Sequence, residues 1–325
     1  ARRRGPLSVD SGDECTVDRP RVTAGDPGGW LALSCVRCGS AFVWNARVMS
    51  PSKEVPLEGG ASTAIHRLDG MVLRRWRPWS DSVIALLRHL ESVGFTGAPR
   101  VVGSGQSSDG REAVTFIEGE SPHPRAWTEE AVHDIGEMLR DLHRATASFS
   151  LPDAHWMPWW GRTLDMADPV IGHCDLGPWN IVAVDGVPVA FIDWDSAGPV
   201  GRRLEIAQTA WLNAQLHDED VASRVGLPGL SARAQQLRAF CDGYGLSQRA
   251  RVGLVDAMVE VAVRTSAQEA IDSGVTPDGV EPTGVGLLGG GPAFTGHDLL
   301  WAVTWRTRSA AWMLRHRATL ENALT

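Results

Sequence analysis

Lysine and long apolar runs are the main absences in this sequence. Lys53 is the single lysine among 31 basic residues, so chemistry that elsewhere uses a buried lysine must rely on another side chain here. No segment approaches the roughly 18 uninterrupted apolar residues that a membrane helix requires. The opening Arg2-Arg3-Arg4 is not followed by the apolar stretch of a secretory signal. We therefore expect a cytoplasmic protein that has no membrane partner.

The sequence also lacks a disulfide framework. Its five cysteines are odd in number and scattered along the chain, which favours a reducing compartment. Cys35 and Cys38 have the C-x-x-C spacing of zinc ligands, but no second pair follows to complete four ligands. We therefore favour incidental thiols over a zinc site.

The overall composition is that of an ordinary globular protein. With 325 residues, 43% apolar and 22% charged, the chain is long enough for one large domain or two lobes around a sizeable core. The net charge of −8 argues against a nucleic-acid partner. It is compatible with a cationic substrate, as is the acidic run Asp218-Glu219-Asp220, although a solvated surface is the simpler interpretation of that run. The composition does not indicate an oligomeric state.

The sequence pattern divides the chain into three segments. Residues 1–56 mix glycine, proline and charged residues without a sustained period, which predicts a loosely ordered leader. Residues 57–120 predict a small antiparallel sheet with one helix, in which Gly59-Gly60 forms a turn and Asp69-Gly70 forms a hairpin. Two strands joined by this glycine turn are expected within 57–68, and further strands are expected at 71–74, 100–103 and 112–117. The helix carries Val83, Ile84, Leu86, Leu87 and Leu90 at helical spacing.

Residues 121–325 predict a mainly helical lobe. Helices are expected from Thr128 onward and then over 203–217, 231–243, 249–272 and 298–324. The glycine-rich stretch 273–296 between the last two is either a substrate lid or an insertion, and the sequence does not choose between them. The predicted fold class is α+β.

An apolar hairpin is predicted near the middle of the chain. The strands 181–184 and 187–192 are joined by Asp185-Gly186, a two-residue turn signal. Asn180 begins the first strand and Asp193 follows the second. The open end of the hairpin therefore brings these two side chains together.

Asp175 lies at the same end of the hairpin, in the loop before Asn180. Carboxylate and amide oxygens of this kind suit Mg²⁺, and a further carboxylate can accept a proton from an attacking hydroxyl. Positioning, charge neutralisation by a metal and a weak base are what phosphoryl transfer needs. The alternative is an ordinary hairpin with a polar loop. The H-x-D-x-x-x-x-N spacing, followed after the hairpin by Ile-Asp-Trp, favours a functional site.

With these motifs the sequence resembles the aminoglycoside phosphotransferase family, relatives of protein kinases that phosphorylate small molecules. The resemblance covers roughly 57–325 and follows the family's order, from the glycine turn through Val72-Leu73-Arg74-Arg75 and the catalytic stretch to the closing helix. It implies a protein-kinase-like, two-lobed α+β fold. It also implies an ATP- and Mg²⁺-dependent transfer of the γ-phosphate to a hydroxyl of a small molecule.

The resemblance implies a role for each matching residue. Asp175 matches the catalytic base, and His173 matches the residue that braces its loop. Asn180 and Asp193 match the ligands that hold Mg²⁺ against the nucleotide phosphates. Glu205 matches a position with a structural role. The implied nucleotide contacts are Gly59, Gly60 and Arg74 on the phosphate side and Phe116, Ile117 and Glu118 at the adenine edge.

The phosphate side departs from the kinase pattern. Arg74 stands where kinases carry a lysine, and Val83 stands where the partner glutamate would align. This departure motivates an alternative, a non-catalytic nucleotide-binding pseudokinase. A third possibility is a metallohydrolase that uses His173, Asp175 and Asp193. Analogy at the level of the fold does not select the acceptor.

Overall fold

The computed structural model describes residues 33–34, 41–42, 54–57, 65–164, 166–272, 274–276, 279–280 and 296–325. Residues 1–53 and 54–325 form two compact units. In the first unit, the strands β1 (Leu33–Ser34) and β2 (Ala41–Phe42) pair antiparallel. The predictions made for the rest of the leader up to residue 53, for Cys35 and Cys38, for Gly59 and Gly60, and for most of 273–296 lie outside the described residues.

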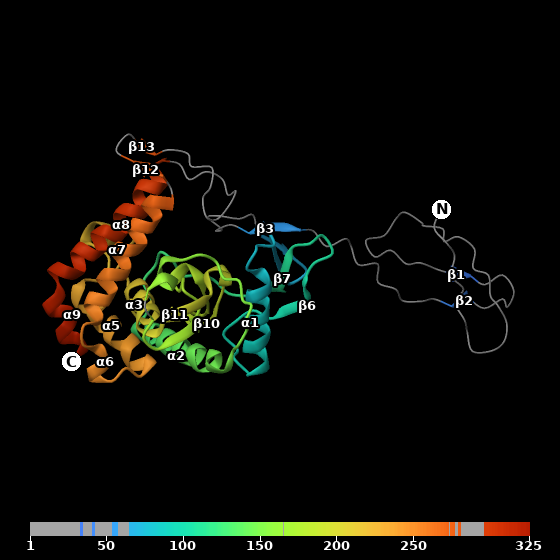
Figure 1. The fold of residues 1–325 in the computed structure, drawn as a ribbon, viewed down its shortest axis with the longest axis horizontal. Coiled ribbons are helices and arrows are strands. Elements are labelled where there is room, and N and C mark those ends of the chain that lie inside the picture. The colour runs from blue at the N-terminus through green and yellow to red at the C-terminus, as the bar shows by residue number, and fades with distance from the viewer. Residues whose placement is uncertain are drawn as a thin grey trace. The chain divides into compact units, whose positions relative to one another are not determined.

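The second unit begins with a five-stranded antiparallel sheet whose strand order is β3-β4-β5-β7-β6 (Figure 1). The predicted Asp69-Gly70 hairpin is confirmed, and its residues have φ values of 48° and 77°, the positive angles that a tight two-residue turn requires. Strand β3 begins two residues before the predicted start of the small lobe. The strands are β3 (Val55–Leu57), β4 (Ile65–Leu68), β5 (Met71–Arg74), β6 (Val101–Gln106) and β7 (Glu112–Thr115).

Helix α1 (Ser80–Ser92) packs against β6 and supplies much of the core beside the sheet. Its apolar side chains recur every three to four residues, so they lie on one side of the helix and are buried together. The buried positions are those predicted: Val83, Ile84, Leu86, Leu87 and Leu90.

Residues 116–122 connect the sheet to the helical region and lie against a second hairpin, formed by β9 (Ile181–Val184) and β10 (Val187–Phe191). Glu120 and Ala183 exchange two backbone hydrogen bonds of 2.9 and 2.8 Å. Gly119 permits this approach, because its φ is 146° and a Cβ there would lie 2.5 Å from the Ala183 carbonyl oxygen. The division into lobes at residue 120 stays a prediction, since residues 54–325 form one compact unit.

The rest of this unit is mainly helical. Helix α2 (Glu129–Ala145) packs along α5 (Leu230–Tyr244), and α7 (Leu254–Asp272) packs along α8 (Gly296–Arg315). Figure 1 shows the sheet and α1 at one end of the unit and α5 to α9 at the other. The remaining helices are α3 (Arg202–Asn213), α4 (Glu219–Arg224), α6 (Gln248–Arg251) and α9 (Arg317–Leu324), and the remaining strand pairs are β8 (Pro169–Gly172) with β11 (Gly198–Gly201) and β12 (Val275–Thr276) with β13 (Gly279–Val280).

Three predicted helices have different boundaries in the structure. The helix predicted over 249–272 is divided into α6 and α7 at Gly253, whose φ is 69°. The helix predicted over 203–217 ends at Asn213, because Gln215 adopts a φ of 48°. The final helix is interrupted at His316. The α+β class is nevertheless confirmed, since a small antiparallel sheet precedes a mainly helical region. Among the described residues, no helix has both the length and the apolar character needed to span a membrane.

Candidate functional site

The open end of the β9–β10 hairpin forms the centre of the site. The predicted turn residues, Asp185 and Gly186, have φ values of 51° and 81°. At the opposite end of the hairpin the Ile192 N–H donates to the Asn180 carbonyl at 2.9 Å. Asp193 follows directly, with a left-handed φ of 60°. The hairpin therefore places Asn180 next to the backbone that carries Asp193.

Asn180 orients the Asp175 carboxyl group. Its Nδ2 donates to Oδ2 of Asp175 and to the Asp175 carbonyl, both at 2.9 Å. Burial and the negative charge of Asp193 raise the pKa of Asp175 to about 7, while Arg306 and the side chains of Asn180 and Trp179 oppose the rise. A half-buried carboxylate with this pKa accepts a proton near neutral pH, which is the property that a general base needs.

His173 is buried behind the loop that carries Asp175. Its Nε2 lies 2.9 Å from the Ile192 carbonyl, so Nε2 carries the proton and donates it. Burial lowers the pKa of His173 to about 4, and the ring is neutral at pH 7. The Trp194 ring lies beside it, with centroids 4.6 Å apart. His173 thus joins the loop to the end of the hairpin, the position that a bracing residue would occupy.

Glu205 of α3 anchors the same loop. Its Oε1 accepts the backbone N–H groups of His173 and Cys174 at 2.6 and 2.9 Å. Its Oε2 lies 2.7 Å from Nε2 of His143, whose Nδ1 is 2.8 Å from the Tyr244 hydroxyl. Burial alone would raise the pKa of Glu205, but the hydrogen bond and charge of His143 and the loop N–H groups keep it below its usual value. These contacts agree with the structural role expected for Glu205.

Arg74 is buried at the end of β5 and joins three carboxylates. Its Nη2 is 2.6 Å from Glu112 Oε1 and 3.3 Å from Asp195 Oδ1, and its Nη1 is 3.0 Å from Asp193 Oδ1. Arg74 and Glu112 face each other across the pairing of β5 with β7, and the Ser80 hydroxyl donates to the other Glu112 oxygen at 3.0 Å. The glutamate partner of Arg74 therefore comes from the neighbouring strand rather than from α1.

Asn180 and Asp193 keep oxygen atoms that suit a divalent cation. Asn180 uses its amide nitrogen for Asp175, which leaves Oδ1, and Asp193 uses Oδ1 for Arg74, which leaves Oδ2. Neither remaining oxygen accepts a hydrogen bond from the described part of the chain. Mg²⁺ binds to one or two such protein oxygens and completes its shell with phosphate and water. The residues present therefore fit this ion.

The segment implied as the adenine edge follows β7. Phe116 donates its N–H to the Gly70 carbonyl at 2.7 Å, whereas Ile117 and Glu118 make no backbone hydrogen bonds within the described ranges. The Arg67 guanidinium lies 3.8 Å over the Phe116 ring and pairs with the Glu118 carboxylate. Arg67 thus fixes this segment against β4 and leaves the backbone groups of Ile117 and Glu118 for a ligand.

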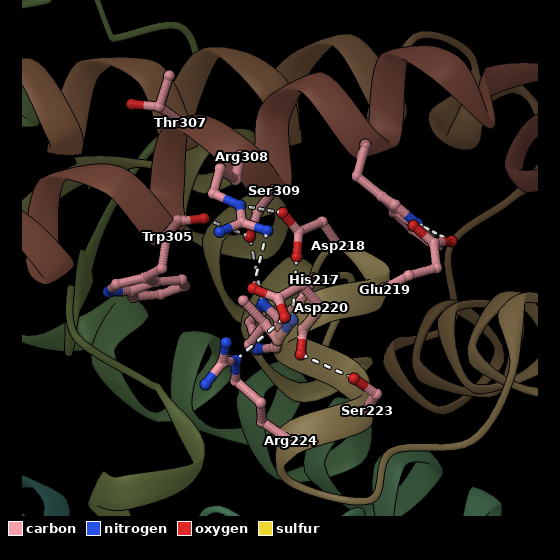
Figure 2. A network of polar contacts seen from close by, with 12 residues as sticks. His217, Asp218, Glu219, Asp220, Ser223, Arg224, Trp305, Thr307, Arg308 and Ser309 are labelled. Atoms are coloured by element: carbon pink, nitrogen blue, oxygen red, sulfur yellow. Dashed lines mark hydrogen bonds and ion pairs between the residues drawn. The ribbon is translucent and has the colours of Figure 1, made fainter.

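The acidic run after α3 forms ion pairs with α8 (Figure 2). Asp218 accepts a backbone N–H at the start of α4, and Arg308 pairs with Asp218 and, at 3.1 Å, with Asp220. His217 Nδ1 lies 3.3 Å from the Ser309 hydroxyl. The solvated surface predicted for this run is wrong for Asp218, which is 6% exposed. Asp218 caps the start of α4, and both Asp218 and Asp220 pair with Arg308 of α8. The run therefore joins α4 to α8.

Comparison with known proteins identifies the family. A model described as the phosphotransferase enzyme family matches residues 53–165, which include the sheet, α1 and α2 but end before the β9–β10 hairpin. The trifolitoxin immunity protein of Rhizobium leguminosarum bv. trifolii is 51% identical over 272 residues, which are 83% of this chain and 98% of that protein. The chain belongs to the phosphotransferase enzyme family. The family resemblance of the sequence is thereby confirmed.

Solved structures of phosphotransferases also align with much of this chain. A choline/ethanolamine kinase family protein from Mesorhizobium loti has a TM-score of 0.47 and 14% identity, covering 84% of this chain and 93% of that one. The gentamicin complex of APH(2")-IIa has a TM-score of 0.48 and 12% identity, covering 83% and 93%.

No sequence motif marks two charged residues of this site, Glu112 and Arg306. Glu112 starts an unremarkable strand, and its pairing with Arg74 depends on the order of strands in the sheet. Arg306 lies in α8 with two other arginines, Arg308 and Arg315, and only the packing of α8 brings its charge to Asp175.

Proposed function

We propose that this phosphotransferase family member uses ATP and Mg²⁺ to move the γ-phosphate to a hydroxyl of a small molecule. The observation that carries the proposal is the convergence of Asp175, Asn180 and Asp193 at the open end of one hairpin. Family membership gives the reaction class, and the oxygen donors fit the metal. Because such a reaction draws on cellular ATP, we expect it in the cytoplasm.

In the proposed mechanism, Asp175 acts as the base. The acceptor oxygen attacks the γ-phosphorus, its proton passes to an Asp175 carboxylate oxygen, and the bond to the β-phosphate oxygen breaks to release ADP. Asn180 holds the carboxyl group in place through Nδ2, and Glu205 and His173 hold the loop. Asn180 Oδ1 and Asp193 Oδ2 would hold Mg²⁺, which neutralises phosphate charge when bound.

The test is ADP release on a panel of hydroxyl-bearing acceptors. Asp175→Asn should lower turnover by about 10²–10⁴-fold, the usual contribution of a positioned base. Asp185→Asn is the matched control, because Asp185 is exposed at the far turn of the same hairpin and should leave turnover unchanged. Full activity in Asp175→Asn would contradict the assignment.

The metal assignment has a separate test. ATP should raise the melting temperature of the wild type more strongly when Mg²⁺ is present. In Asp193→Ala the stabilisation by ATP should no longer depend on Mg²⁺, because a metal-binding oxygen has been removed. An unchanged Mg²⁺ dependence in this variant would exclude Asp193 as a ligand.

The second candidate is a nucleotide-binding pseudokinase, and the ion pairs of Arg74 favour it. Arg74 is already paired with Glu112, Asp193 and Asp195, so its guanidinium is less available to phosphates than a kinase lysine would be. This candidate predicts that ATP stabilises the protein equally with and without Mg²⁺, and that no acceptor releases ADP.

The name of the similar immunity protein adds a biological setting. We propose that this chain protects a cell by phosphorylating a hydroxyl of a toxin. Expression in a strain sensitive to trifolitoxin should protect it, and Asp175→Asn should not. Equal protection by Asp175→Asn would mean that binding rather than phosphoryl transfer is protective.

A further inference from the structure

The positive charge of Arg306 on α8 lowers the pKa of Asp175, and the proposed reaction does not use this charge. Its Nη1 lies 2.5 Å from Glu269 Oε2 of α7 and donates to the Ala302 carbonyl at 2.6 Å. A guanidinium offers five N–H donors in a planar fork. Within the described ranges, the hydrogen bonds of Arg306 involve Nη1 alone, so Nε and Nη2 remain available to a ligand.

Aromatic rings connect Arg306 to the loop of Asp175. The guanidinium carbon of Arg306 lies 4.7 Å from the centre of the Trp305 ring. Trp305 meets Trp179 edge to face with centroids 6.5 Å apart, and the Trp179 side chain, in the loop between Asp175 and Asn180, lowers the pKa of Asp175. All four side chains are half-buried, so a ligand can reach them while they remain partly shielded from water.

Three acidic groups beside α8 in the described part of the chain are already paired. Glu269 is bound by Arg306, and Asp218 and Asp220 are bound by Arg308 of the same helix. A cationic acceptor would have to displace an arginine from one of these carboxylates. An anionic acceptor would instead meet the open N–H groups of Arg306.

We propose that Trp179, Trp305 and Arg306 form the acceptor subsite of this phosphotransferase, and that the acceptor carries an anionic group, such as a carboxylate, beside a planar ring and the reacting hydroxyl. Charge-assisted hydrogen bonds from a guanidinium select planar anions. Trp305 is already stacked on Trp211, with ring centroids 5.5 Å apart, so a flat ligand would pack against Trp179. The inference rests on the proposed function, because it assigns the acceptor of that reaction.

A purely structural Arg306 is the competing explanation, since the ion pair with Glu269 joins α7 to α8. Those helices are also joined by Ser266, whose hydroxyl lies 2.8 Å from the Val303 carbonyl and 2.9 Å from the Thr307 hydroxyl. A structural arginine predicts no dependence of binding on the charge of the ligand. The charge of the ligand therefore separates the two explanations.

The test uses three probes that share a phenyl ring and a hydroxyl: 3-phenyllactate is anionic, 3-phenyllactamide is neutral and phenylalaninol is cationic. Their binding to the full chain is measured by calorimetric titration without nucleotide, so that it does not depend on turnover. The wild type should bind 3-phenyllactate about tenfold more tightly than the amide. Arg306→Gln should remove this preference, and Arg306→Lys should keep part of it. Arg315→Gln, at an exposed arginine of the same helix, should keep it in full.

The proposal is overturned if no probe binds, if the amide or phenylalaninol binds as tightly as 3-phenyllactate, or if Arg306→Gln keeps the preference. A second measurement, ADP release in the presence of ATP and Mg²⁺, distinguishes failure of the subsite proposal from failure of the proposed function. Charge-selective binding without ADP release from any acceptor would support the subsite and count against the phosphotransferase. ADP release that is indifferent to acceptor charge would support the phosphotransferase and refute the subsite.

Discussion

Replacing Glu205 with alanine should lower the free energy of unfolding by about 3–5 kcal/mol, the usual cost of removing one partner from a buried charged pair. The carboxylate is 0% exposed and accepts three hydrogen bonds, from the backbone of His173 and Cys174 and from the ring of His143. Without it, two loop N–H groups and one imidazole N–H lose their acceptor in the interior.

The magnitude follows from these three contacts. A hydrogen bond to a charged group contributes about 1.5–3 kcal/mol, so three would contribute about 4.5–9 kcal/mol, a range that begins near the upper end of the expected loss. Relaxation of the loop and entry of water into the vacated space reduce the sum. Glu205→Gln keeps an oxygen for the two loop N–H groups, and we expect it to cost only about 1–2 kcal/mol.

The contribution of Glu205 to the free energy of unfolding depends on pH with a defined sign. The pKa of Glu205 is held below its usual value, so the unfolded state binds the proton more readily. The stabilisation is therefore present above the unfolded pKa, near 4.5, and is lost as the pH falls through the lower pKa of the folded state. In Glu205→Gln this acid-dependent loss should disappear.

Urea unfolding at pH 7, followed by circular dichroism, measures the loss. Glu260→Gln is the matched control, because Glu260 is half-exposed and pairs with Arg264 one turn away. Its replacement should change stability by less than about 0.5 kcal/mol. A loss below about 1 kcal/mol for Glu205→Ala would refute the argument that this carboxylate anchors the loop.

Two further predictions concern the packing and the acid sensitivity of the helical region. Gly172→Ala should destabilise the protein by more than about 3 kcal/mol in urea unfolding, because the new Cβ would lie 1.8 Å from Glu205 Oε2. Gly229→Ala is the control. No atom lies within 4 Å of its Cβ, so it should change the stability by less than about 1 kcal/mol. Equal effects of the two substitutions would contradict the close packing of Glu205 on β8. Burial, helped by the charges of Arg233 and His123, lowers the pKa of His217 to about 3, although Asp218 opposes this. Because the unfolded ring binds a proton near pH 6.5, stability should fall as the pH drops from 6.5 toward 3, by up to about 1.4 kcal/mol per pH unit from this group. His217→Asn should flatten that profile in urea unfolding, and replacing the exposed His155 with asparagine should not.

The sequence by itself determined the local structure around the site. Asp69-Gly70 and Asp185-Gly186 specify their hairpins because both turn positions need a positive φ, which these residues adopt at little cost. The helical spacing of the apolar residues in α1 likewise specifies which of its faces is buried. These signals lie within a few residues of one another, so they can be recognised without the rest of the molecule.

Tertiary structure alone decided which charges meet. Arg74 finds its carboxylate on Glu112, 38 residues away in sequence, because β5 and β7 are neighbours in the sheet. Arg306 acts on Asp175 because α8 packs against the core of the helical region, and the same packing brings Arg308 to Asp218. Electrostatic interaction depends on distance in space and on burial, and no period or spacing along the chain encodes either quantity.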